Sequence, residues 1–182
     1  MKIDSASGLV QGVRYVPSPN CDDRPEDASP EVLVIHSISL PPGEFGGPGI
    51  EQLFSNTLNP ADHPYYREIA DHRVSAHLLI RRNGEVIQFV PLHRRAWHAG
   101  QSCCEGRTRV NDFSIGIELE GADDRPFEPI QYQVLAELTR AIREIYPAIT
   151  SDRLYGHADI SPGRKTDPGP HFDWQQYRAL CA

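Results

Sequence analysis

The architecture of this chain is indicated by one apolar run, Val32-Leu33-Val34-Ile35-His36-Ser37-Ile38. Its apolar residues fall on both alternating faces, which is typical of a central strand that is covered on both sides. The run carries a histidine, His36, near its end. A lone histidine in such a place is ordinarily a core residue satisfied by one hydrogen bond, so its role depends on what the rest of the chain offers.

Two further segments predict strands beside this one. Residues 76–80 and 85–90 are strand-like and flank Asn83-Gly84, a dipeptide that favours a tight hairpin. Residues 113–120 alternate, so that one face of the predicted strand is aliphatic and the other holds two small residues and two acids. The aliphatic face consists of Ile115, Ile117 and Leu119, and the other face of Ser114, Gly116, Glu118 and Glu120.

Helices are predicted on either side of the sheet. Residues 129–146 carry an apolar stripe with a proline at each end, which is typical of a buried amphipathic helix. Residues 50–56 favour a short helix, and Asp173 is placed to cap a last helix over residues 174–180. The first 30 residues are rich in turn formers and predict an irregular arm. We therefore expect an α/β (α+β) fold, a mixed central β-sheet flanked by helices, in one domain over residues 1–182.

Composition excludes several classes of protein. Of the 182 residues, 39% are hydrophobic and 24% are charged, which argues against a disordered chain. No apolar run is long enough to span a membrane, and the N-terminus lacks the apolar region of a signal peptide. A net charge of −7 argues against nucleic acid as a partner. Four scattered cysteines predict free thiols in a reducing compartment, so we expect a cytoplasmic protein; they are Cys21, Cys103, Cys104 and Cys181.

The densest group of reactive side chains lies in a turn-rich segment, residues 155–170. It holds His157 and Asp167, with nine residues between them, and Lys165 close to Asp167. Together with His36, these side chains offer two imidazoles and one carboxylate, a donor set typical of a catalytic zinc site that keeps one position for water. Asp167 precedes Pro168, which disfavours a helix there and favours a loop.

Other assignments remain open from the residues alone. Glu118 and Glu120 are two acids on one strand face, and paired carboxylates are typical of glycoside cleavage. Neighbours on one strand lie side by side rather than across a substrate, so we favour Glu118 as a single general base and Glu120 as a supporting or exposed acid. Lys165 is either a donor to a developing oxyanion or an exposed charge. Six other histidines are possible rival ligands: His63, His72, His77, His93, His98 and His171.

Four segments in order resemble a known family. Residues 34–47, 95–100, 111–121 and 155–170 are similar to the cytoplasmic 1,6-anhydro-N-acetylmuramyl-L-alanine amidases of Gram-negative bacteria. These belong with the zinc amidases of bacteriophage lysozyme type and with the peptidoglycan recognition proteins. The likeness runs from about Val16 onward and implies the peptidoglycan-recognition-protein-like amidase fold.

The resemblance assigns a role to each candidate residue. It implies that His36, His157 and Asp167 bind zinc, that Glu118 is the catalytic acid/base and that Lys165 stabilises the transition state. Residues in the positions of Trp97, Arg73, Arg109 and Ser37 hold the sugar and the stem peptide in similar proteins. The chain departs from the usual pattern at three positions, where it has Ser37 instead of asparagine and also has Ala158 and Gly163.

The implied activity is zinc-dependent hydrolysis of the amide between the lactyl group of (1,6-anhydro-)N-acetylmuramic acid and L-alanine, in peptidoglycan recycling. The expected partners are small soluble anhydro-muropeptides, with no nucleic acid and no membrane, and we expect a monomer. Two alternatives stay open: a general amidase of the intact wall, and a module that binds peptidoglycan fragments without cleaving them. A pure binder can lose the ligands or the base, and this chain keeps all of them.

Overall fold

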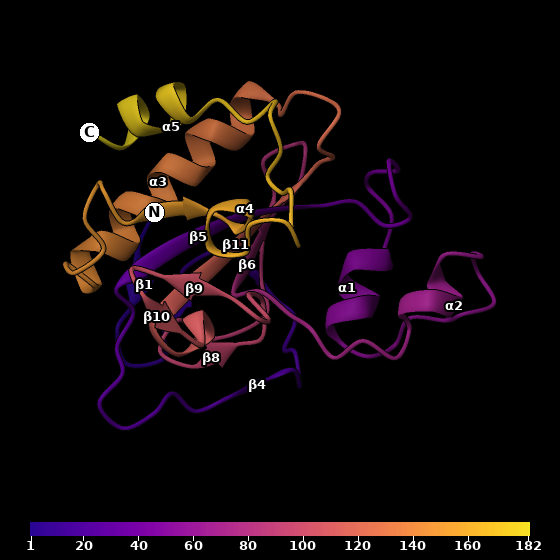
Figure 1. Cartoon of the computed structure of the whole chain (residues 1–182), viewed down its shortest axis with the longest axis horizontal. Helices are drawn as coiled ribbons and strands as arrows, with labels where there is room; N and C mark the ends of the chain where they lie inside the picture. The colour runs from indigo at the N-terminus through magenta and orange to yellow at the C-terminus, as the bar shows by residue number, and fades with distance from the viewer.

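A six-stranded mixed sheet forms the centre of the computed structural model, which describes residues 1–182 (Figure 1). The strand order is β12-β5-β11-β6-β7-β3. Only the hairpin β6–β7 is antiparallel, and every other neighbouring pair is parallel. The strands are β3 (Arg14–Tyr15), β5 (Val32–Ile38), β6 (Leu78–Ile80), β7 (Val86–Gln88), β11 (Ser114–Glu120) and β12 (Leu154–Gly156). The predicted mixed sheet, central strand and hairpin are therefore confirmed.

Two helices cover one face of the sheet, and a pair of short helices projects to the side (Figure 1). The covering helices are α3 (Pro129–Ile145) and α5 (Trp174–Cys181), both as predicted, and Asp173 Oδ1 accepts a hydrogen bond from the Gln176 amide at the start of α5. The projecting pair is α1 (Gly49–Phe54) and α2 (Tyr66–Ile69). The short elements that remain are β1 (Ile3–Asp4), β2 (Leu9–Val10), β4 (Cys21–Asp22), β8 (Arg95–Ala96), β9 (Cys103–Cys104), β10 (Arg107–Thr108), η1 (Val110–Phe113) and α4 (His157–Ile160).

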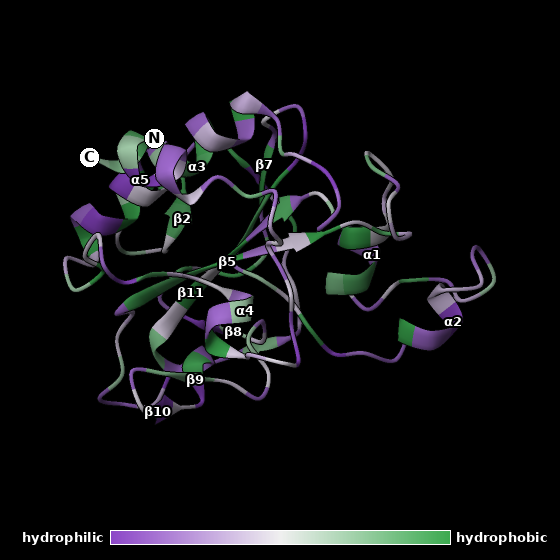
Figure 2. Ribbon diagram, turned by 45° about the horizontal axis from the view of Figure 1, so that its top comes forward, coloured by the Kyte–Doolittle hydropathy of each residue, from purple (hydrophilic) through white to green (hydrophobic).

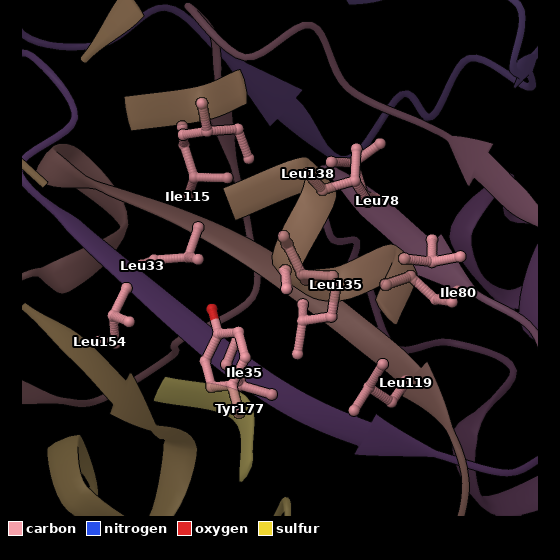
Figure 3. Packing of buried hydrophobic residues seen from close by; sticks show 14 of the residues in the cluster. Leu33, Ile35, Leu78, Ile80, Ile115, Leu119, Leu135, Leu138, Leu154 and Tyr177 are labelled. Carbon is pink, nitrogen blue, oxygen red and sulfur yellow. The ribbon is translucent and has the colours of Figure 1, made fainter. Parts of the chain in front are cut away.

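The main core lies between the sheet and these two covering helices. Leu33 and Ile35 of β5 are fully buried, and they belong to one apolar cluster with Leu135 of α3 and Tyr177 of α5 (Figure 3). Figure 2 shows hydrophobic residues along β5 and β11, while the helices above them alternate between polar and apolar faces. Every residue of β11 is buried, so its polar face is also covered rather than exposed to water. That second face carries Glu118, the predicted general base.

The N-terminal arm is more ordered than the sequence predicts. Strand β3 joins the edge of the main sheet, and Arg24 reaches into the interior, where it donates hydrogen bonds to four backbone oxygens. These oxygens belong to Leu92, Asn111, Asp112 and Ser114. Two-residue strands leave no periodic pattern in a sequence, so composition alone predicted a loop. No helix of the structure is both long and apolar enough to cross a membrane.

Glu120 has a structural role that separates it from Glu118. Its side chain is 2% exposed and pairs with Arg81 at 2.7 Å, while it also accepts hydrogen bonds from the backbone amides of Gly46 and Arg82. Arg81 in turn bonds Glu51, which also binds the more exposed Arg14. This geometry agrees with the interpretation of Glu120 as a supporting acid and contradicts its interpretation as an exposed acid.

We expect Arg81→Met to lower the free energy of unfolding by about 3–5 kcal/mol, because it leaves the buried Glu120 carboxylate without its cation. Arg14→Met is the matched control. Arg14 also pairs with Glu51, but its side chain is 47% exposed, so its loss should cost less than about 1 kcal/mol. Urea denaturation of the two variants measures the difference, and equal costs would contradict a structural role for the Arg81–Glu120 pair.

Candidate metal and catalytic site

Strand register brings the principal candidates together. In the parallel pairing of β5 with β11, His36 lies directly opposite Glu118. On the other side of β5, Gly156 of β12 lies opposite Ile35, so the next residue, His157, comes level with His36. Three neighbouring parallel strands therefore present His157, His36 and Glu118 in one row, at the carboxyl ends where open parallel sheets commonly bind ligands.

Three donor atoms converge at this edge of the sheet. His36 Nδ1 lies 3.0 Å from His157 Nδ1 and 3.2 Å from Asp167 Oδ2, and the third side of the triangle, from His157 Nδ1 to Asp167 Oδ2, is 3.1 Å. In a tetrahedral zinc site with bonds of about 2.0–2.1 Å, neighbouring donors lie about 3.3 Å apart. Two imidazole nitrogens that face each other so closely cannot both carry protons. The donor set and its spacing therefore fit zinc.

The electrostatics of the triangle suit a metal ligand set. Burial lowers the pKa of His36 to about 4, although the hydrogen bond with Asp167 acts in the opposite direction, so the imidazole is neutral at neutral pH. Burial alone would raise the pKa of Asp167, but its hydrogen bonds with His157 and His36 bring that pKa well below the usual range. The site thus presents two imidazoles and one carboxylate anion, of which His36 and His157 are almost completely buried.

Glu118 has the environment of a general base. Its side chain is buried, and burial raises the pKa of the carboxyl well above its usual value, with the Asp167 charge acting in the same direction and Lys165 in the opposite one. Glu118 Oε2 is completely enclosed and has no hydrogen-bond partner in the protein. A buried carboxylate oxygen without a partner is costly unless a ligand or water completes it. Glu118 thus lines the cavity and has no partner for this oxygen inside the protein, which fits the predicted general base.

A cavity of about 770 Å³ opens over these side chains. Its floor includes His36, Glu118, His157 and Asp167, and Lys165 also lines it. The cavity also has apolar lining residues, which come from the end of β5, from α1 and α2 and from the loops beside them. They include Ile38, Leu40, Leu53, Phe54, Ile69 and Val74. The size matches pockets that bind small molecules, which commonly combine apolar walls with a few polar groups.

Asp123, which the sequence analysis did not identify, holds the loop that carries Lys165 and Asp167. Asp123 accepts hydrogen bonds from the hydroxyl of Thr166, which stands between those two residues, and from Ser37 Oγ at 3.3 Å. Asp123 therefore joins the end of β5 to the loop. Its position after β11 gave no signal, because Asp123-Asp124 resembles an ordinary polar turn.

The predicted substrate-binding residues are not all at the cavity. Ser37 lines it, whereas Trp97, Arg73 and Arg109 are not among its lining residues. The Trp97 indole N–H donates to Asp22 at 3.1 Å, Arg73 bonds the Ala70 carbonyl, and Arg109 pairs with Asp112 while its side chain stays 70% exposed. A role for these three residues in holding the substrate stays a prediction.

The rival histidines do not join the metal triangle. The three residues whose donor atoms converge are His36, His157 and Asp167. His98 is nevertheless part of the site, because its Nδ1 lies 2.9 Å from His36 Nε2, on the side of the ring away from the triangle. From the sequence, His98 was only one of six possible rival ligands of the metal.

Comparison with known proteins identifies the family. The model of the Amidase_2 family, N-acetylmuramoyl-L-alanine amidase, matches residues 26–170, and the chain belongs to this family. It is similar to the 1,6-anhydro-N-acetylmuramyl-L-alanine amidase AmpD of Escherichia coli (strain K12), with 58% identity over 175 residues, or 96% of this chain and 95% of the relative. The resemblance and the enzyme class predicted from the sequence are confirmed.

Solved structures agree with the sequence comparison. The crystal structure of a selenomethionine derivative of AmpD covers the whole of both chains with a TM-score of 0.96 and 55% identity. The amidase AmiD from E. coli, in complex with its substrate anhydro-N-acetylmuramic acid-L-Ala-D-γ-Glu-L-Lys, has a TM-score of 0.60 and 36% identity, covering 86% of this chain and 60% of that one. The predicted fold class is confirmed.

Proposed function

We propose that this chain hydrolyses the amide between the lactyl group of 1,6-anhydro-N-acetylmuramic acid and L-alanine of the stem peptide, with zinc as its cofactor. The observation that carries the proposal is the row formed by His36 of β5, Glu118 of β11 and His157, which directly follows β12. In this row the Glu118 carboxyl, which has a buried oxygen without a partner, lies beside three converging donor atoms, and this supports the proposal. The full-length likeness to AmpD and the substrate complex of AmiD support the choice of muropeptide.

His36, His157 and Asp167 would hold the zinc ion through Nδ1, Nδ1 and Oδ2. When bound there, zinc polarises the scissile carbonyl and lowers the pKa of water. Glu118, which lines the cavity, takes the proton of the attacking water and then delivers it to the leaving alanine nitrogen. Lys165 donates a hydrogen bond to the oxyanion that develops on the carbonyl. Asp123 holds the loop that carries Lys165 by its contacts with Thr166 and Ser37.

We further propose that residues 1–182 act as one amidase domain in the cytoplasm, as a monomer in peptidoglycan recycling. The main sheet supports one domain because its strands come from both ends of the chain, β3 at Arg14–Tyr15 and β12 at Leu154–Gly156. All four cysteines are unpaired, which suits a reducing compartment.

We expect the soluble 1,6-anhydro-muropeptide to be cleaved with a much higher kcat/KM than polymeric peptidoglycan, because the full-length relative is named for that substrate and a cavity of about 770 Å³ has the size of a small-molecule site. Mass spectrometry of the products should show free stem peptide and the intact anhydro sugar. Comparable kcat/KM on purified sacculi would favour a general wall amidase. Binding of the muropeptide without cleavage by zinc-loaded protein would favour the non-catalytic module.

A further inference from the structure

The outer nitrogens of the two ligand histidines point to adjacent residues of one segment. His36 Nε2 lies 2.9 Å from His98 Nδ1, and His157 Nε2 lies 3.2 Å from the backbone oxygen of Ala99. Since both rings turn Nδ1 toward the triangle, both Nε2 atoms face residues 98 and 99. The segment of residues 98 and 99 therefore contacts both imidazoles on the side away from the donor triangle.

We propose that His98 and Ala99 form a positioning element that sets the tautomers and ring orientations of both zinc-ligand histidines. This inference rests on the proposed function, because it takes Nδ1 as the metal-binding atom in each ring. A ligating histidine commonly donates its other N–H to a fixed acceptor, which orients the ring and presents the lone pair to the metal.

The direction of each hydrogen bond follows from the donor triangle. If Nδ1 of His36 gives its lone pair to the metal, its proton is on Nε2, and His98 Nδ1 has to accept it. The proton of His98 is then on Nε2, which lies 2.9 Å from the hydroxyl oxygen of Ser114. Ala99 O can only accept, so it requires the proton of His157 on Nε2. These contacts agree with one arrangement of protons. Arg164 Nη2 also lies 3.4 Å from His157 Nε2, but it donates to Ala99 O at 2.7 Å, so Ala99 O accepts from both.

One side chain, Asn111, binds the backbone of both residues of the element. Asn111 Oδ1 accepts hydrogen bonds from the backbone amides of both His98, at 3.2 Å, and Ala99, at 2.8 Å. Asn111 belongs to η1, which leads directly into β11. The acceptors of both ligand histidines are thus tied to the strand that carries Glu118.

The polar face of β11 is shaped around the His98 ring. A Cβ at Gly116 would lie 2.5 Å from His98 Cγ, so only glycine leaves room for the imidazole there. Ser114, two residues earlier on the same face, bonds the ring, and Glu118, two residues later, is the proposed base. Three successive positions on this face of β11, Ser114, Gly116 and Glu118, thus belong to the candidate site.

The test compares two replacements of His98 of similar size. Asn keeps an acceptor oxygen near the position of Nδ1, whereas Leu has none. We expect His98→Leu to weaken zinc binding by about 10–100-fold, as loss of a ligand's hydrogen-bond partner commonly does, and His98→Asn to retain most of the affinity. Competition with a chromophoric chelator measures the dissociation constant of each purified protein. His171→Leu, which changes an exposed histidine outside the cavity lining, is the control.

Nuclear magnetic resonance of the zinc-loaded wild type supplies a readout that a merely structural role would not give. A ¹⁵N–¹⁵N coupling across the hydrogen bond should join His36 Nε2 to His98 Nδ1, with the proton on His36. Asn111→Ala leaves both rings intact and covers the case in which His98→Leu fails to fold. It should weaken zinc binding and speed solvent exchange of the Nε2 protons on both His36 and His157.

The outcomes separate the two proposals. Wild-type protein that binds no zinc would overturn both the proposed function and this inference. Zinc binding by the wild type with equal affinity in His98→Leu would overturn the positioning role alone, as would a proton on His36 Nδ1 in the loaded protein. Weaker binding in His98→Leu, recovery in His98→Asn and the expected coupling would support it.

Discussion

Glu118→Gln should lower kcat by about 10²–10⁴-fold, the range typical of a lost general acid–base group, while zinc content stays at the wild-type level. Glutamine has almost the same shape but cannot take a proton from water. The variant should also be at least as stable as the wild type, because burial of the Glu118 carboxylate has no compensating partner inside the protein. Steady-state kinetics, metal analysis and urea denaturation measure the three quantities.

Glu120→Gln is the contrasting variant. Glu120 lies two residues further along the same strand, but its carboxylate pairs with buried Arg81 and accepts hydrogen bonds from two backbone amides. Its replacement should lower stability and leave kcat of the folded protein much less affected. Equal loss of kcat in two folded variants would show that Glu118 is not the single base.

His36→Ala should abolish turnover and release the metal. The variant keeps His157 and Asp167, but two donors hold zinc far less tightly than three, and the row of functional side chains loses its central member. Elemental analysis should find little zinc in the purified variant. Equimolar zinc should fail to restore its activity.

Chelation of the wild type provides the companion measurement. Removal of zinc should stop turnover, and added Zn²⁺ should restore it. Zinc at about 1,000 times its dissociation constant should also stabilise the folded protein by about 4 kcal/mol, which appears as a higher Tm. A metal-free preparation with full activity would contradict the site.

The sequence predicted those parts of the fold whose pattern is local. The apolar run of β5, the Asn-Gly hairpin and the stripe of α3 each extend over enough residues to show a period, and all three are present. The N-terminal arm was only partly anticipated. Its strands are two residues long, and Arg24 finds its partners 68 to 90 positions away, so no local pattern records them.

The candidate site divides in the same way. His36, Glu118, His157, Lys165 and Asp167 were named from residue type and from the family resemblance, and all five line one cavity. Sequence alone did not assign the roles of His98, Asn111 and Asp123, because these depend on which atom of each side chain meets which partner. These contacts depend on the register between strands that are distant in the sequence. The register is known only from the assembled sheet.

The donor triangle also bears on how the enzyme matures. His36 and Asp167 are separated by 131 positions in the chain, although their donor atoms lie 3.2 Å apart. In the folded protein the sheet holds both side chains in place, so a bound ion does not bear the entropic cost of closing so long a loop. During synthesis the first ligand leaves the ribosome long before the last. A chain that is still being synthesised therefore lacks the complete ligand set until Asp167 has joined the folded sheet.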